Sequence, residues 1–226
     1  MIWWGKLFHT KLSIVFPAYN EAENIRTSIE GALPFIHSHD AEIIVVDDGS
    51  QDTTAARVLQ LQQPRVRLIS HAQNRGYGAA LRTGFLQARG EWIFFTDADL
   101  QFDLAQLHLF WQHKDAYDLI IGYRSPRKDP LHRRIYGRMW RALVNYKCGL
   151  KIRDINCAFK LMRRECVQAR PILASGASIN AELLYHLKSK RILQLPVLHQ
   201  PRTKGVQTGA QPDVIMRALW ELWQLQ

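Results

Sequence analysis

The chain has 226 residues, of which 47% are hydrophobic and 22% are charged, and this composition excludes a wholly disordered protein. Its three cysteines, Cys148, Cys157 and Cys166, are too few for a disulfide framework and fit no zinc-binding spacing, so we expect free thiols in a reducing compartment. The formal net charge of +10 and the pI of about 9.8 favour an anionic partner.

Short apolar runs alternate with longer segments of helical composition along the first half of the chain. We expect strands at residues 12–16, 42–46, 66–70, 92–96 and 118–122, and helices at residues 21–35, 52–63 and about 77–88. Buried strands separated by helices of this length are typical of βαβ units. The pattern therefore predicts an α/β sandwich with a mostly parallel sheet, in a single domain over residues 1–226.

The charge is divided unevenly between the two halves of the chain. Residues 1–121 hold 10 Lys and Arg against 14 Asp and Glu, whereas residues 122–226 hold 20 against 6. This asymmetry suggests a metal- or sugar-handling half at about 12–121, joined to a half at about 122–226 that faces phosphates or a membrane. The alternative is a basic surface that serves only solubility.

Polar and acidic residues follow the predicted strands at the points where the strands end. In chain order these are Tyr19 with Glu21, Asp48, the segment 74–78, and Asp97 with Asp99. Ligands of open α/β sheets bind beyond the carboxyl ends of the strands. The sequence therefore predicts a binding site at this edge of the sheet.

Asp97 and Asp99 leave an apolar strand two residues apart, so both carboxylates can face one cation. Carboxylate oxygens suit Mg²⁺ or Mn²⁺, and such a cation would in turn bridge a nucleotide diphosphate. Gln101 follows two residues after Asp99. The alternative interpretation is a turn with two solvated carboxylates.

Two further segments carry weaker signals. Asp48 ends a β-branched strand and could accept hydrogen bonds from a ribose or a base, whereas Ser50 or Asp52 is expected to cap the next helix. The segment 74–78 is rich in glycine but lacks the full G-x-G-x-x-G spacing, so a plain turn and a phosphate contact both remain open.

Together these segments form a recognisable series. The chain resembles the family 2 glycosyltransferases of the GT-A fold, and within them it is most similar to dolichol-phosphate mannose synthases and the related bacterial polyprenyl-phosphate sugar synthases. The resemblance runs through PAYNEAENI (17–25), VVDDGSQDTT (45–54), NRGYGAAL (74–81), DADLQFD (97–103), GYR (122–124), LHRR (131–134), DINCAFKLMRRE (154–165), AELL (181–184), LPV (195–197) and PRTKG (201–205). It implies inverting transfer of a sugar from a nucleotide diphosphate sugar, of the GDP-mannose or UDP-hexose type, to a polyprenyl or dolichyl phosphate.

The resemblance also implies a role for each matched position. The nucleotide sugar would be bound by Pro17, Tyr19, Glu21, Val46, Asp48, Gly76, Asp97, Ala98 and Asp99. Asp97, Asp99 and Gln101 would hold the divalent cation and, with Asp154, form the catalytic set. Phosphates would be bound by Arg124, Arg133 and Arg202, since arginine stays charged and forks onto phosphate oxygens.

Two departures from the family bear on the acceptor. Gly137 stands where the synthases often have serine, and residues 205–208 lack the lysine of their late segment. A hydroxyl acceptor, on a glycan or a lipid, therefore stays open, and it would need a general base. Asp154 and Glu182 are the candidates, although Asp154 could equally be a salt-bridged structural acid.

The basic half carries two amphipathic segments. Residues 122–147 hold eight Lys and Arg against one acid. Apolar residues recur there at helical spacing (Ile135, Met139 and Leu143; Trp140 and Val144), and again near the end of the chain (Val214, Ala218 and Leu222; Ile215, Leu219 and Trp223). Such stripes serve either core packing or the interface of an anionic bilayer. We expect peripheral attachment to the cytoplasmic face of a membrane, with neither a spanning segment nor a secretory leader.

Three other functions fit the sequence less well. The chain has no nucleic-acid-binding motif, and its acidic strand ends would repel phosphate without a metal. Nucleotidyl transfer would want a basic, glycine-rich loop after the first strand, where residues 17–21 read PAYNE. A non-catalytic nucleotide-sugar-binding protein remains an alternative.

Overall fold

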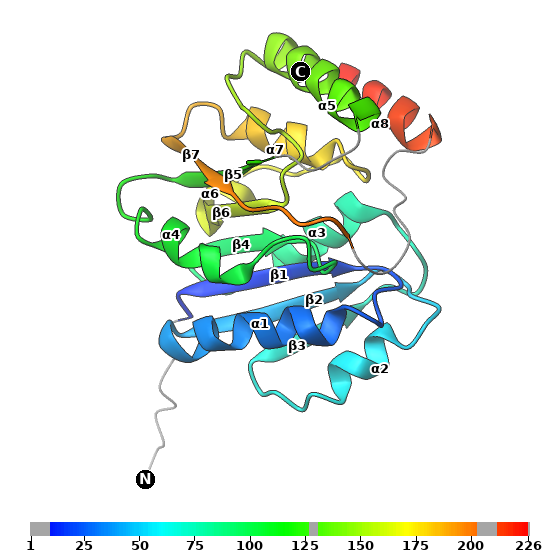
Figure 1. The fold of residues 1–226 in the computed structure, drawn as a ribbon, viewed down its shortest axis with the longest axis vertical. Helices are drawn as coiled ribbons and strands as arrows, with labels where there is room; N and C mark the ends of the chain where they lie inside the picture. The colour runs from blue at the N-terminus through cyan, green and yellow to red at the C-terminus, as the bar shows by residue number, and fades with distance from the viewer. Residues whose placement is uncertain (1–9, 127–130, 203–211, 226) are drawn as a thin grey trace.

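A computed structural model gives the structure of residues 10–126, 131–202 and 212–225, with the side chains of 131–133 and 212–215 excepted. Seven strands form one sheet in the order β3-β2-β1-β4-β6-β5-β7 (Figure 1). Their bounds are β1 Leu12–Ala18, β2 Ala41–Asp47, β3 Val66–Ser70, β4 Trp92–Thr96, β5 Leu119–Arg124, β6 Phe159–Arg163 and β7 Ile192–Val197. Only β6 runs antiparallel to its neighbours β4 and β5. The mostly parallel sheet that we predicted is therefore confirmed.

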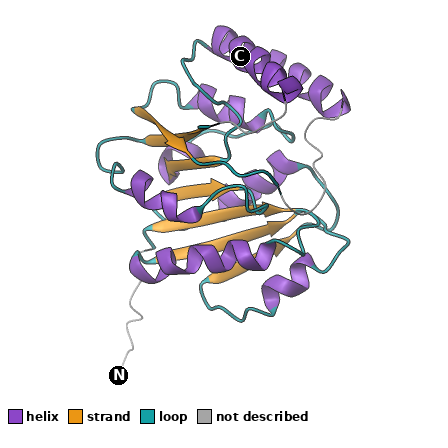
Figure 2. Cartoon of the chain, in the orientation of Figure 1, coloured by secondary structure: helices purple, strands orange, loops and turns teal. Residues whose placement is uncertain are grey.

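Helices cover both faces of the sheet (Figure 2). They are α1 Ile25–Ser38, α2 Thr54–Leu59, α3 Tyr77–Gln87, the 3₁₀ turn η1 Leu104–Gln106, α4 Leu107–Trp111, α5 Leu131–Cys148, α6 Arg164–Gln168, α7 Ile179–His186 and α8 Pro212–Gln224. Because successive strand residues point to opposite faces, Phe94 packs with α1 and α4 while Phe95 packs with α3 and α7. Each face of the sheet thus has its own apolar core.

Several element boundaries differ from the sequence-based expectation. β1 continues through Pro17, which pairs in register with Val46. Proline has no amide hydrogen to donate, but a strand does not donate every one of its amides to a parallel neighbour. The first helix begins at Ile25 rather than residue 21, because Glu21 first forms a turn whose carbonyl accepts from the amides of Asn24 and Ile25. That helix also continues past Pro34 to Ser38.

The carboxyl ends of β1, β2 and β4 meet at one edge of the sheet. Ala18 lies opposite Asp47 across the β1–β2 pair, and β4 ends at Thr96 beside β1. The segment after β4 is held by a bridge between Phe102 and His199, and by the amide of Gln200, which donates to the carbonyl of Gln101 (2.8 Å). This edge therefore brings chain segments together from far apart in the sequence.

Candidate functional site

A group of three carboxylates and one guanidinium lies at this edge of the sheet. Asp97 accepts a hydrogen bond from the Tyr77 hydroxyl (3.0 Å). Arg202 places one nitrogen 2.6 Å from a Glu21 oxygen and another 3.7 Å from an Asp99 oxygen. The structure thus brings together Glu21, Asp97, Asp99 and Arg202. Glu21 and Arg202 are 181 residues apart in the sequence.

Burial makes the negative charge at this group costly. It raises the pKa of Asp97 to about 7, and the negative charge of Asp99 adds to the shift. Burial likewise raises the pKa of Asp99, although hydrogen bonding from the Gln101 amide and the charge of Arg202 oppose it. A cation between the two carboxylates would remove this cost.

The donor set fits a hard divalent cation. Carboxylate oxygens are the ligands that Mg²⁺ and Mn²⁺ prefer. Within the described ranges, no cluster of three or more His, Cys, Asp or Glu side chains could hold a metal ion. The other coordination positions at Asp97 and Asp99 would therefore fall to oxygens of a bound ligand or of water.

Asp48 is buried and has both carboxylate oxygens hydrogen-bonded by the chain itself. They accept from the amides of Arg75 (3.0 Å) and Gly76 (2.8 Å) and contact Nδ1 of His71 (2.6 Å). The other ring nitrogen of His71 lies 2.9 Å from the Thr83 hydroxyl. Asp48 therefore holds the 74–76 loop against β2, in a partnership with His71 that the sequence pattern did not reveal.

The other positions expected to bind the nucleotide differ in exposure. Tyr19 is 40% exposed at the end of β1, whereas Pro17, Val46 and Ala98 are buried. Val46 belongs to the apolar core, so only its backbone could face a ligand. The cap expected at Ser50 or Asp52 is wrong, because the N-cap of α2 is Thr53; Asp52, one residue earlier, instead accepts from the amide of Thr54 (2.9 Å) in the turn before the helix.

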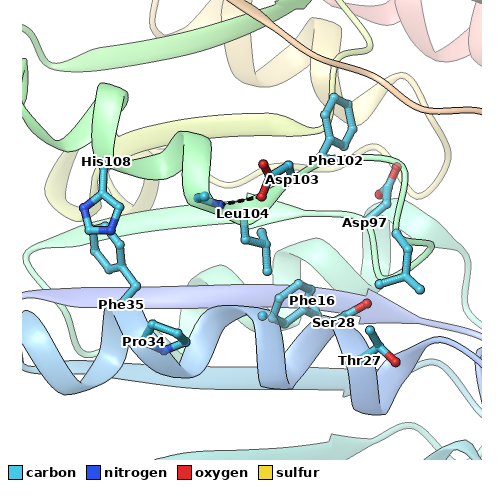
Figure 3. Close-up of a pocket in the computed structure, with 13 residues that line it drawn as sticks. Phe16, Thr27, Ser28, Pro34, Phe35, Asp97, Phe102, Asp103, Leu104 and His108 are labelled. Carbon is cyan, nitrogen blue, oxygen red and sulfur yellow. Dashed lines mark hydrogen bonds between the residues drawn. The ribbon is translucent and has the colours of Figure 1, made fainter.

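A cavity of about 300 Å³ opens beside Asp97, between α1 and the segment that follows β4 (Figure 3). Its walls are largely apolar and are formed by Phe16, Thr27, Ser28, Gly31, Pro34, Phe35, Leu100, Phe102, Asp103, Leu104, Ala105 and His108 together with Asp97. Leu100 in this wall has a φ of +63°, which is strained for a bulky side chain. The backbone after β4 is thus held in one unusual turn next to the carboxylate pair.

Residues 13–170 match the sequence profile described as Glycosyl transferase family 2, and this match covers well over half of the chain. The chain belongs to glycosyl transferase family 2.

Two curated relatives carry the name undecaprenyl-phosphate 4-deoxy-4-formamido-L-arabinose transferase. The one from Photorhabdus laumondii is 30% identical over 201 residues, covering 86% of this chain and 62% of the relative. The one from Yersinia enterocolitica is 31% identical over 201 residues, covering 86% and 61%. The chain thus spans about three fifths of the length of these relatives.

Solved structures of a glycosyl transferase show the same fold. Glucosyl-3-phosphoglycerate synthase from Mycobacterium tuberculosis, in complex with Mn²⁺, UDP and glucosyl-3-phosphoglycerate, superposes with a TM-score of 0.73 at 21% identity, over 96% of this chain and 81% of that one. The same enzyme with Mg²⁺ and UDP gives a TM-score of 0.73 at 20% identity, over 96% and 80%. The predicted GT-A fold is therefore confirmed.

Two residues that the family 2 resemblance assigned to phosphate binding and catalysis are paired with each other. Arg124 donates to both oxygens of Asp154, at 2.8 and 3.0 Å. Glu182, the other candidate base, accepts from the amides of Leu173 (2.8 Å) and Ala174 (2.7 Å). Both candidate bases therefore make contacts within the protein, and Asp154 forms the salt bridge that the alternative interpretation expected, while its catalytic role stays a prediction.

Of the remaining positions that the family 2 resemblance singled out, Gln101 and Gly76 lie within the described residues and make structural contacts. The side-chain nitrogen of Gln101 donates to the carbonyl of Gln200 (3.0 Å), so Gln101 helps to hold the segment that carries Arg202. Gly76 has a φ of +96°, and a Cβ there would lie 2.5 Å from the Ser175 carbonyl oxygen, so glycine is required. The side chain of Arg133 and the segment 205–208 lie outside the described residues.

Lys160 on β6 is fully buried near the carboxylates, and the sequence analysis gave it no role. Its ammonium donates to the carbonyls of Ile155 (3.1 Å) and Cys157 and to the side-chain oxygen of Asn180 (2.7 Å). Burial lowers its pKa to about 8, although the negative charges of Asp154 and Asp97 oppose the shift. Lys160 was missed because charged residues in a short run argue against a buried strand.

The Lys160 pKa predicts a pH dependence of stability. Between its folded pKa of about 8 and the ordinary value of 10.5, the folded protein binds fewer protons than the unfolded one. The Lys160 contribution to the free energy of unfolding therefore rises with pH in this window, by up to about 1.4 kcal/mol per pH unit. Urea unfolding of the wild type and Lys160→Met from pH 7 to 10 would measure it as the difference between the two proteins. A difference that stays constant with pH would contradict the prediction.

Proposed function

We propose that this family 2 glycosyltransferase moves a sugar from a nucleotide diphosphate sugar to a polyprenyl phosphate. The observation that carries the proposal is the carboxylate pair at the end of β4, half-buried Asp97 and buried Asp99, with Glu21 and Arg202 beside it. The names of the two curated relatives support a lipid phosphate as the acceptor.

The edge of the sheet offers complementary groups for the donor. Tyr19 and Glu21 after β1, Asp48 after β2 and the 74–76 loop after β3, which Asp48 holds, would contact the nucleoside. Asp97 and Asp99 would hold Mg²⁺ or Mn²⁺, which when bound supplies charge neutralisation for the departing diphosphate. Arg202, now between Glu21 and Asp99, would contribute a further positive charge to the same phosphates.

The two candidate bases, Asp154 and Glu182, already form hydrogen bonds within the protein, and this favours a phosphate acceptor over a hydroxyl. A polyprenyl monophosphate has a second pKa of about 6, so it is largely dianionic at neutral pH and attacks without a strong base. It needs positioning opposite the leaving diphosphate, which gives inversion at the sugar carbon. A hydroxyl needs a base, and Asp154 and Glu182 are already occupied by Arg124 and by backbone amides.

Helix α5 supports attachment to a membrane surface. Its side chains Ile135, Tyr136, Met139, Leu143 and Tyr146 are exposed, and at about 100° per residue they share one face about 100° wide. Val144 and Cys148 on the opposite side are buried in the core. Basic residues flank the exposed apolar face, with Arg134, Arg138 and Arg141 on one side and Lys147 on the other.

Helix α8 extends this surface. It lies beside α5 (Figure 1), and the Lys147 ammonium contacts both the carbonyl (2.6 Å) and the ring of Trp223 (4.6 Å from the centroid). Ala218 and Leu222 face the core, while Met216, Leu219, Trp220 and Trp223 are exposed. The described part of the chain contains no helix that is long and apolar enough to cross a bilayer. We propose that α5 and α8 lie on an anionic bilayer, at the cytoplasmic face, and bring the site to its lipid acceptor.

Removing apolar side chains from this surface tests the attachment. The double variant Met139→Ser and Trp220→Ser is expected to partition at least about tenfold less onto phosphatidylglycerol vesicles, since each buried apolar side chain contributes up to about 1.5–3 kcal/mol. Leu86→Ser on α3, at 65% exposure comparable to the 64% of Met139, is the matched control and should bind like wild type. Vesicle sedimentation measures both, and equal loss in the control would contradict a specific surface.

Transfer of label tests the reaction itself. The protein is incubated with Mn²⁺ and labelled GDP-mannose, UDP-glucose, UDP-N-acetylglucosamine or nucleotide-linked 4-deoxy-4-formamido-L-arabinose, with and without undecaprenyl phosphate in liposomes. Label in the lipid phase that depends on undecaprenyl phosphate is the expected result. Transfer only to a soluble hydroxyl would contradict the acceptor, and nucleotide binding without any transfer would favour a non-catalytic protein.

A further inference from the structure

Helix α8 carries an inward-facing carboxylate, Glu221, that links it to the segment 173–178. The Glu221 side chain is 10% exposed and accepts from the Ser175 amide (3.3 Å), the Ser175 hydroxyl (3.0 Å) and the Ser178 hydroxyl. Arg217, one turn earlier, donates to Glu221 (3.2 Å) and to the Ser175 hydroxyl. Although burial opposes ionisation, the hydrogen bonds from Ser178 and Ser175 lower the pKa of Glu221. Glu221 is therefore a hydrogen-bonded anchor for the segment 173–178.

The 173–178 segment in turn packs against the start of α3. The amide of Gly78 donates to the Ser175 carbonyl (2.8 Å). A Cβ at Gly78 would lie 2.6 Å from the Ala174 carbonyl oxygen, and one at Gly76 would lie 2.5 Å from that of Ser175. The backbones of residues 174–175 and 76–78 thus approach so closely that a shift of the 173–178 segment must also move residues 76–78, called here the glycine loop.

The glycine loop carries contacts into the candidate site. The Gly76 amide donates to Asp48 (2.8 Å), and the hydroxyl of the adjacent Tyr77 donates to Asp97 (3.0 Å). Contacts therefore run without a break from Glu221 on α8, through Ser175, to the 76–78 loop and the carboxylates. Helix α8 lies outside residues 13–170, which match the family profile.

We propose that Glu221 is a positioning residue, which acts through the 173–178 segment to hold Gly76 and Tyr77 in the arrangement that binds the nucleotide diphosphate. The affinity for nucleotide would then depend on how α8 is seated, so that the helix that rests on the membrane also supports the donor site. This inference rests on the proposed function, because it assumes a nucleotide at the Asp97 and Asp99 edge.

The test compares Glu221→Ala with Glu221→Gln, which keeps an oxygen acceptor and a polar partner for Ser178. The matched control is Glu30→Ala, since Glu30 forms the same kind of one-turn pair with Arg26 on α1 (2.9 Å). Binding of UDP and of GDP in the presence of Mn²⁺ is measured by calorimetry without membranes. Hydrogen exchange is followed in the peptide covering residues 74–81, and thermal unfolding reports whether each variant is folded.

Glu221→Ala is expected to bind the nucleotide about tenfold more weakly, as is usual for coupled sites, and to exchange faster at residues 74–81. Glu221→Gln and Glu30→Ala should behave like wild type. If Glu221→Ala does not fold, Ser175→Ala removes a single hydroxyl and should shift both readouts in the same direction. Faster exchange confined to α8 with unchanged affinity would overturn the positioning role alone. A wild type that binds neither nucleotide would overturn the proposed function, and the positioning role with it.

Discussion

Asp99→Asn is expected to reduce sugar transfer at least about 100-fold, the magnitude typical of losing one charged group that stabilises a developing negative charge. The substitution removes one of two carboxylates that would share a divalent cation and leaves the shape of the turn, since an amide oxygen can still accept from Gln101 (3.1 Å to the Asp99 carboxylate). Initial rates with saturating Mn²⁺ measure the effect. Nucleotide binding without metal should change little.

Asp103→Asn is the matched control for this prediction. Asp103 lies in the same segment after β4, where its carboxylate accepts from the Ala105 amide (2.9 Å). Because an asparagine oxygen also accepts that bond, the control should retain transfer within a few-fold of wild type. Full activity in Asp99→Asn, or an equal loss in Asp103→Asn, would contradict the metal role of the pair.

Gly78→Ala is expected to lower the free energy of unfolding by about 2–3 kcal/mol, as overpacking against rigid backbone does. The added methyl would meet three atoms of the 174–176 backbone within 3 Å, and neither backbone can move without disturbing the glycine loop. Urea unfolding measures the loss, and weaker nucleotide binding should accompany it because Tyr77 and Gly76 move with the loop.

Gly31→Ala gives the opposite expectation in another helix. A methyl there would meet only the Leu104 side chain at 3.4 Å, which is an ordinary contact. Since alanine is the better helix former, this variant should be stabilised by about 0.5–1 kcal/mol. Equal destabilisation of the two variants would contradict the prediction that the close backbone contact at Gly78 requires glycine.

The strand-end residues could be predicted from the sequence because their geometry is local. Asp97 and Asp99 follow an apolar strand, Asp48 follows another, and parallel strands bring their carboxyl ends to the same edge. No long-range information is needed for that inference beyond the direction of the strands. The fold class and the location of the carboxylate pair were accessible for this reason, whereas the family came from the resemblance of the motifs.

The partners of these residues could not be predicted, because they come from distant segments. Arg124 pairs with Asp154 across 30 residues, and Asp48 meets His71 and the 75–76 amides across 23 to 28. The antiparallel strand β6 was missed because Lys160 looks unsuited to a core until Asn180 and two carbonyls are known to surround its ammonium. Tertiary pairing decides such roles, and a single sequence does not record it.

The most direct test of the proposed metal and nucleotide site is a crystal structure of the protein with Mn²⁺ and UDP, in which anomalous scattering locates the ion. We expect an anomalous peak in contact with carboxylate oxygens of Asp97 and Asp99, with the diphosphate on the same ion and the uridine toward Tyr19 and Glu21. A structure in which the nucleotide occupies another place, or in which it binds here with no ion at the two carboxylates, would contradict a metal-bound nucleotide diphosphate at Asp97 and Asp99.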